Sequence, residues 1–137
     1  MLVIEHKNGQ GPKNLTVLIL DDDVSVLRSL ERLVRALGFH VRAFTTPTAL
    51  LKSEIPVTDA CMLLEVNLPE MDGTRLIELV AERGRVLPTI LMTARPDDPR
   101  TNRLIQQARA VTTLYKPFSA DLLLDALSTA FGRQEPN

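Results

Sequence analysis

The chain has one cysteine, one tyrosine and no tryptophan, and aromatic residues make up 4% of its 137 residues. One cysteine excludes an internal disulfide framework, and the apolar run around Cys61 favours a small buried side chain. No apolar run approaches the roughly 20 residues that a membrane-spanning helix needs. The run Leu2, Val3, Ile4 is also too short for a signal peptide. We therefore expect a cytoplasmic protein with no membrane partner.

Neither sign of charge is in excess, since 16 basic and 17 acidic residues give a formal net charge of −1. This balance argues against direct nucleic-acid binding, and the helical spacing of Arg28, Arg32 and Arg35 indicates a solvated helix face. His6 and His40 are isolated and suggest no triad. With 45% hydrophobic residues, the length predicts one compact domain with one core.

Short apolar runs alternate with helical patterns along the chain. Runs typical of strands buried on both faces are Leu15 to Leu20, Phe39 to Ala43, Ala60 to Leu64, Leu87 to Met92 and Ala110 to Leu114. Helical patterns follow them at Val26 to Leu37, Thr48 to Lys52, Leu76 to Val80, Leu104 to Ala108 and Leu122 to Phe131. Asp72 and Ser119 are placed to cap two of these helices, and Gly38 to end the first.

Five strands alternating with five helices predict an α/β domain with a parallel sheet between two helical layers. The predicted domain covers residues 15–131. A flexible N-terminal extension of residues 1–14 precedes it, and residues 132–137 form a polar C-terminal tail.

Polar side chains stand where four of the predicted strands end. Asp21 and Asp22 follow the first strand, Glu65 the third, Thr93 closes the fourth and Lys116 follows the fifth. Because the carboxyl ends of parallel strands share one edge of the sheet, we expect the acids to converge there. Converging carboxylates repel one another unless a cation or a shifted protonation state compensates.

Magnesium is a candidate for that cation, since it prefers oxygen ligands and keeps several waters. The residues suggest Asp22, Glu65 and the carbonyl oxygen of Asn67 as its direct ligands.

Four motifs together resemble the receiver domain of bacterial two-component response regulators. They are Leu18 to Asp23, Asn67 to Gly73, Met92 to Ala94 and Tyr115 to Phe118, in family order within a resemblance that covers Leu15 to Phe131. The resemblance implies a single (βα)5 flavodoxin-like domain with strand order 2-1-3-4-5. It also implies a cis peptide between Lys116 and Pro117.

The resemblance also assigns roles in phosphoryl transfer. Asp21 would contact the magnesium ion through water, and Lys116 would neutralise the acceptor or a phosphoryl oxygen. The hydroxyl of Thr93 would hydrogen-bond another such oxygen.

Glu65 departs from the family, in which the phosphoryl acceptor is an aspartate. One extra methylene moves the carboxylate by roughly 1.5 Å, and a misplacement of about 1 Å can cost on the order of 100-fold in a positioned reaction. Phosphoryl transfer is almost entirely positioning and charge stabilisation, so we do not expect efficient phosphorylation. Thr113 also replaces a common aromatic residue, and Pro96 and Pro99 crowd the loop before the fourth helix.

Two interpretations of Glu65 stay open. In one, the longer carboxylate reaches Lys116 and Thr93 and imitates an acyl phosphate; in the other, the site is degenerate and the domain is a phosphorylation-independent adaptor. A conventional receiver with weak phosphorylation at Glu65 is the alternative. Capping by the acids explains Asp23, but not the convergence of the whole set.

A metal-dependent phosphatase on a flavodoxin-like fold is a further alternative, using the acids, Thr93 and Lys116. A flavin or nucleotide carrier is disfavoured, because no Gly-rich loop follows the first strand. Only 21 residues follow Lys116, so we expect a stand-alone signalling domain in a two-component or phosphorelay pathway, not an enzyme. The resemblance implies a histidine kinase, phosphotransfer protein or downstream regulator as partner. It also implies a possible homodimer through the fourth helix, fifth strand and fifth helix.

Overall fold

The computed structural model describes residues 14–132, with five strands and five helices in strict alternation. In chain order these are β1 (Thr16–Leu20), α1 (Val24–Ala36), β2 (His40–Phe44), α2 (Pro47–Lys52), β3 (Ala60–Glu65), α3 (Gly73–Glu82), β4 (Thr89–Thr93), α4 (Pro99–Gln107), β5 (Thr112–Tyr115) and α5 (Ala120–Gly132). The predicted N-terminal extension and C-terminal tail lie outside the described residues, except for Asn14 and Gly132.

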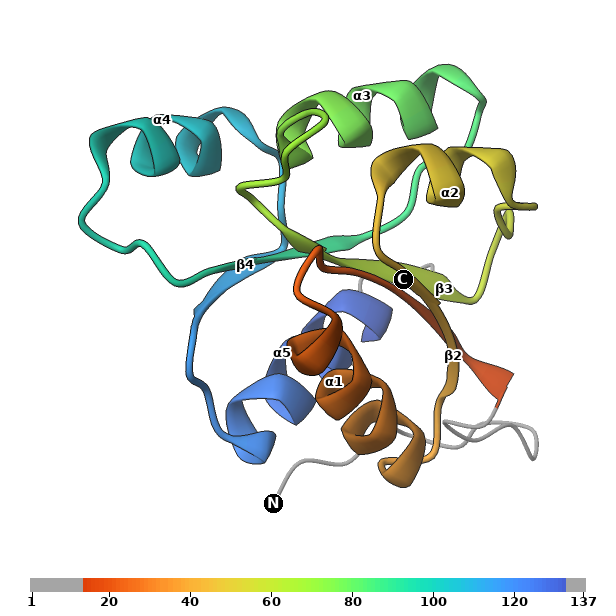
Figure 1. Cartoon of the computed structure of the whole chain (residues 1–137). Helices are drawn as coiled ribbons and strands as arrows, with labels where there is room; N and C mark the ends of the chain where they lie inside the picture. The colour runs from red at the N-terminus through yellow and green to blue at the C-terminus, as the bar shows by residue number, and fades with distance from the viewer. Residues whose placement is uncertain (1–13, 133–137) are drawn as a thin grey trace.

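The strands form one parallel sheet in the order β2-β1-β3-β4-β5, which confirms the predicted flavodoxin-like topology. Helices α1 and α5 cover one face of the sheet, and α2, α3 and α4 cover the other (Figure 1). The order reverses at β1 and β3, where the connections leave toward opposite faces. In open α/β sheets, the crevice for ligands lies at the carboxyl ends of such strands.

The sheet divides the apolar interior into two clusters, one on each face, instead of the single core predicted from the chain length. Strand β3 is buried along its whole length, and its alternate side chains enter different clusters. Cys61 and Leu63 pack toward α1 and α5, whereas Met62 and Leu64 pack toward α2, α3 and α4. Because successive side chains of a strand point to opposite faces, a continuous apolar run is needed to fill both layers.

Side-chain caps fix where the helices begin. Asp23, Asp72 and Ser119 each accept a hydrogen bond from a backbone N–H in the first turn of α1, α3 and α5, at 3.2, 2.9 and 3.1 Å. The predicted caps at Asp72 and Ser119 are therefore confirmed. Gly38 follows the end of α1 with a φ of 104°, a left-handed conformation that glycine adopts at low cost.

Gly73, the first residue of α3, holds that helix close to the end of β3. A Cβ atom at this position would lie 3.3 Å from the carbonyl oxygen of Glu65 and 3.5 Å from Cδ2 of Leu91. The backbone N–H of Gly73 donates to the carbonyl oxygen of Val66 at 3.1 Å. A larger residue must push the helix away from the sheet.

We expect Gly73→Val to lower the free energy of unfolding by about 1–3 kcal/mol, because a branched side chain overpacks this contact. Gly132→Val is the matched control, since a Cβ atom at Gly132 meets nothing within 4 Å. The control should change stability by about 0.5 kcal/mol or less. Urea denaturation of both variants measures the difference, and equal losses would contradict the close packing of α3 against β3.

Candidate functional site

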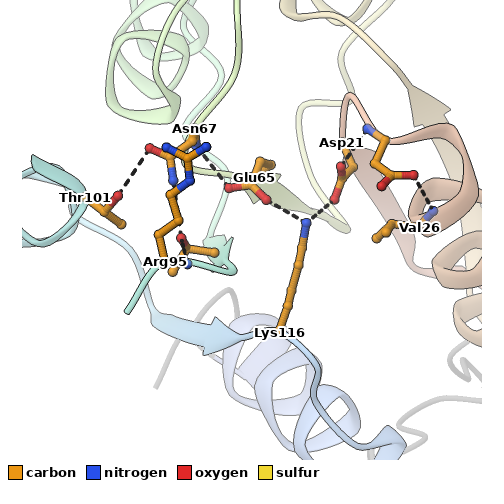
Figure 2. A network of polar contacts seen from close by, with 9 residues as sticks. Asp21, Val26, Glu65, Asn67, Arg95, Thr101 and Lys116 are labelled. Carbon is orange, nitrogen blue, oxygen red and sulfur yellow. Dashed lines mark hydrogen bonds and ion pairs between the residues drawn. The ribbon is translucent and has the colours of Figure 1, made fainter. Parts of the chain in front are cut away.

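Two buried carboxylates stand side by side at the carboxyl edge of the sheet. Asp21 directly follows β1 and Glu65 ends β3, and these strands are hydrogen-bonded neighbours. Asp21 is 1% exposed and Glu65 is 6% exposed. Lys116, which follows β5, extends between them (Figure 2).

The ammonium group of Lys116 donates to both carboxylates. Its Nζ lies 2.5 Å from Oδ2 of Asp21 and 2.6 Å from Oε1 of Glu65, and the lysine side chain is 17% exposed. Burial lowers the pKa of Lys116, but hydrogen bonds and Coulomb attraction from Asp21 and Glu65 outweigh burial and leave the pKa above its ordinary value. The protonated lysine therefore balances the repulsion between the two acids.

The remaining oxygen of each carboxylate accepts a backbone hydrogen bond. Oδ1 of Asp21 accepts from the N–H of Asp23 at 2.9 Å, and Oε2 of Glu65 accepts from the N–H of Asn67 at 3.0 Å. All four carboxylate oxygens of Asp21 and Glu65 thus have a donor. Charge-assisted bonds of this kind are about twice as strong as neutral ones, so they hold both side chains firmly.

Asn67 connects this cluster to the fully buried Thr93. The side-chain Nδ2 of Asn67 donates to Oγ1 of Thr93 at 3.3 Å, and the backbone N–H of Arg95 donates to the same hydroxyl at 3.0 Å. Within residues 14–132, Glu65 makes no direct hydrogen bond to Thr93. Asn67 connects the two residues, through its backbone N–H to Glu65 and its side-chain amide to Thr93.

Asp22 lies apart from the cluster. Its side chain is exposed and lines a cavity of about 290 Å³, together with Asn67, Asp72, Arg95 and Arg100. The sequence predicts that Asp21, Asp22 and Glu65 converge. Asp21 and Glu65 share the ammonium group of Lys116, whereas Asp22 faces the cavity.

Of the predicted magnesium ligands, Asp22 and Asn67 line the same cavity, and Glu65 is hydrogen-bonded to Lys116 and to the N–H of Asn67. In the described part of the chain, no group of three or more His, Cys, Asp or Glu side chains is arranged to hold a metal ion. Both oxygens of Glu65 accept hydrogen bonds from protein donors, and Lys116 occupies the position between the acids. The positive charge between the two acids is therefore the ammonium group of Lys116.

Two further residues, Thr101 and Arg95, contact the site and were not predicted from the sequence. Thr101 of α4 is fully buried and donates its hydroxyl to Oδ1 of Asn67 at 3.3 Å. Arg95 supplies the second donor to Thr93. The helical spacing of Thr101 with Leu104 and Ile105 would have placed this threonine on the inward face. By contrast, the cis peptide between Lys116 and Pro117 is confirmed.

The strand order and the acid–lysine cluster define a flavodoxin-like domain whose functional site lies at the switch point of the sheet. Residues 17–128 match the response regulator receiver domain family. The chain belongs to this family. Such domains generally bind Mg²⁺ at the phosphorylation site and interact with histidine kinases or phosphotransfer proteins.

Curated relatives include the response regulator protein TmoT of Ectopseudomonas mendocina, 35% identical over 92% of this chain and 56% of its own. Nodulation protein W of Bradyrhizobium diazoefficiens is 36% identical over 85% of this chain and 51% of its own. The chain therefore spans about half the length of these relatives.

Solved structures give the same fold. The response regulator StyR is 33% identical, with a TM-score of 0.78 over 88% of this chain and 61% of its own. The FixJ-N structure is 25% identical, with a TM-score of 0.79 over 90% of this chain and 98% of its own. No helix between residues 14 and 132 is both long and apolar enough to cross a membrane.

We expect Lys116→Met to lower the free energy of unfolding at neutral pH by about 3 kcal/mol, because it leaves two buried carboxylates without their counter-ion. Lys52→Met is the matched control, since Lys52 is exposed at the end of α2 and should change stability by about 0.5 kcal/mol or less. Chemical denaturation measures both variants.

Adding Glu65→Gln to Lys116→Met should recover part of the lost stability, because it removes one of the two like charges. No recovery in the double variant would contradict the proposed balance of charges.

Proposed function

We propose that this receiver domain signals without phosphorylation, with Glu65 as a non-phosphorylated residue in the acceptor position. The observation that carries the proposal is the state of the Glu65 carboxylate. Its Oε1 lies 2.6 Å from Nζ of Lys116, its Oε2 accepts the N–H of Asn67 at 3.0 Å, and the residue is 6% exposed.

These contacts oppose attack on a phosphodonor. The attacking oxygen must lose a charge-assisted hydrogen bond before it can align with the phosphorus atom. The glutamate also places its carboxylate roughly 1.5 Å from where an aspartate would, in a reaction that depends mostly on positioning. A magnesium ion would in addition need carboxylate oxygens that now accept protein donors.

The same contacts bear on whether Glu65 imitates a phosphoryl group. A full mimic would engage both Lys116 and Thr93. Here Glu65 engages Lys116 directly, but the hydroxyl of Thr93 is bonded to Asn67 and Arg95. These contacts favour an adaptor with a single conformation of the site over a domain that imitates the complete phosphorylated state.

The remaining alternatives gain less support. Weak phosphorylation at Glu65 requires release of an oxygen from Lys116 or Asn67. A metal-dependent phosphatase would need free carboxylate oxygens for its metal ion, whereas both oxygens of Glu65 accept hydrogen bonds from Lys116 and Asn67.

Output through protein contact is the second part of the proposal. The partner is a histidine kinase, a phosphotransfer protein or a downstream regulator, and the contact face is formed by α4, β5 and α5. This face could also support a homodimer. It carries two large exposed apolar side chains, since Tyr115 is 47% exposed and Leu122 is 54% exposed, and such residues are frequent at interfaces.

We expect no phosphoryl adduct on the unaltered protein after incubation with magnesium and acetyl phosphate, and an adduct on Glu65→Asp. The shorter side chain withdraws the carboxylate from its present contacts and restores the acceptor of the family. Intact-mass spectrometry of both proteins in parallel makes the measurement. Glu65→Ala, which removes the carboxylate, controls for reaction at other sites and should carry no adduct.

An adduct that maps to Glu65 in the unaltered protein would overturn the proposal. An adduct on Glu65→Asp alone would support it, and would show that Glu65 is what prevents transfer in an otherwise competent site.

A further inference from the structure

We propose that Asn67 and Thr101 are positioning residues that couple the carboxylate of Glu65 to helix α4. The inference rests on the proposed function, because α4 belongs to the proposed contact face. It assigns to these two residues a mechanical link that requires neither phosphorylation nor an aromatic side chain on β5.

The link is a continuous chain of hydrogen bonds. Oε2 of Glu65 accepts the backbone N–H of Asn67 at 3.0 Å. The side-chain Oδ1 of the same asparagine accepts the hydroxyl of Thr101 at 3.3 Å, in the first half of α4. One residue therefore contacts the acid through its backbone and the helix through its side chain (Figure 2).

Because Thr101 is buried, water cannot easily replace its hydrogen bond to Asn67. Thr101 is fully buried, and the neighbouring Leu104 packs in the cluster that includes Leu64 and Leu91. A polar group taken out of water costs free energy unless it has a partner. The hydroxyl of Thr101 has Oδ1 of Asn67 and the carboxylate of Asp98, the N-cap of α4, as partners, and only the bond to Asn67 leads from α4 to the site.

The side-chain nitrogen of Asn67 makes a further hydrogen bond that restricts the movement of this residue. Its Nδ2 donates to Oγ1 of Thr93, which also accepts the N–H of Arg95 in the loop that leads to α4. A shift of the Glu65 carboxylate must therefore move Asn67. Because both ends of its amide are bonded, that movement reaches α4 through Thr101 and through the loop together.

Thr113 on β5 makes a separate link to α4 relevant, because it stands where the family resemblance places a coupling residue. The family resemblance places an aromatic switch residue at this position, and a threonine side chain is too short to replace it. Tyr115 pairs with Thr93 in the register of β4 and β5, but its side chain is 47% exposed and makes no hydrogen bond to Thr93 within residues 14–132. The hydrogen bonds through Asn67 and Thr101 would then couple the site to α4 in place of an aromatic side chain at position 113.

The test compares amide chemical shifts of Arg100 to Gln107 in ¹H–¹⁵N NMR spectra. Glu65→Gln changes the charge at the acid while preserving its length, and we expect it to shift the α4 amides. In a Thr101→Val background, the same change should shift them by about half as much or less, because the link is cut without a change of shape. In a Thr101→Ser background, which keeps the hydroxyl, the full shift should return.

Thr89→Val is the matched control, since Thr89 is a buried threonine at the start of β4 whose hydroxyl donates to Leu87. It should leave the response of α4 to Glu65→Gln unchanged. A response that is equal in the Thr101→Val and Thr89→Val backgrounds would overturn the inference, as would an α4 that does not respond to Glu65→Gln at all.

The outcome is separable from that of the phosphorylation test. The NMR comparison uses no phosphodonor, so it detects the link even if an adduct forms on Glu65. In that case the proposed function fails and the coupling stands; if α4 is unresponsive and no adduct forms, the coupling alone fails.

Discussion

The arrangement of the site depends on one ammonium group placed between two buried acids. Asp21 and Glu65 come from adjacent parallel strands, so the fold itself brings their charges together. Without Lys116 this proximity would be repulsive. The lysine directly follows β5, the outer strand on one side of the sheet, and so connects that edge to the central strands β1 and β3.

This constraint supports the proposed function, in which Glu65 is not phosphorylated. Here the longer side chain of Glu65 places one oxygen on Lys116 and the other on the N–H of Asn67. The internal cation and the backbone donor satisfy the acid, and the same backbone donor belongs to the residue that contacts α4.

Much of the fold follows from local patterns. The continuous apolar run of β3 predicts a strand buried on both faces, and Asp72 predicts the start of α3, because both signals lie within a few neighbouring residues. The convergence of Asp21 and Glu65 follows from parallel strand topology alone.

The contacts within the site were harder to predict. Asp22 is exposed and faces the cavity, whereas its neighbour Asp21 is buried and accepts the N–H of Asp23, a difference that no sequence pattern reveals. The link from Asn67 to Thr101 joins residues 34 positions apart through side-chain rotamers. Such contacts depend on the packed positions of α3 and α4, and not on local propensity.

The most direct measurement is the titration of Lys116, followed by NMR of its ¹³Cε resonance in the unaltered protein and in Glu65→Gln. We expect a Lys116 pKa above its ordinary value of 10.5 and a decrease in this pKa when Glu65 loses its charge. A raised folded-state pKa means that the stability contributed by this lysine is complete below about pH 10.5 and is lost as the pH rises through the folded-state value. A pKa at or below the ordinary value, or one unaffected by Glu65→Gln, would contradict the central role of the ammonium group.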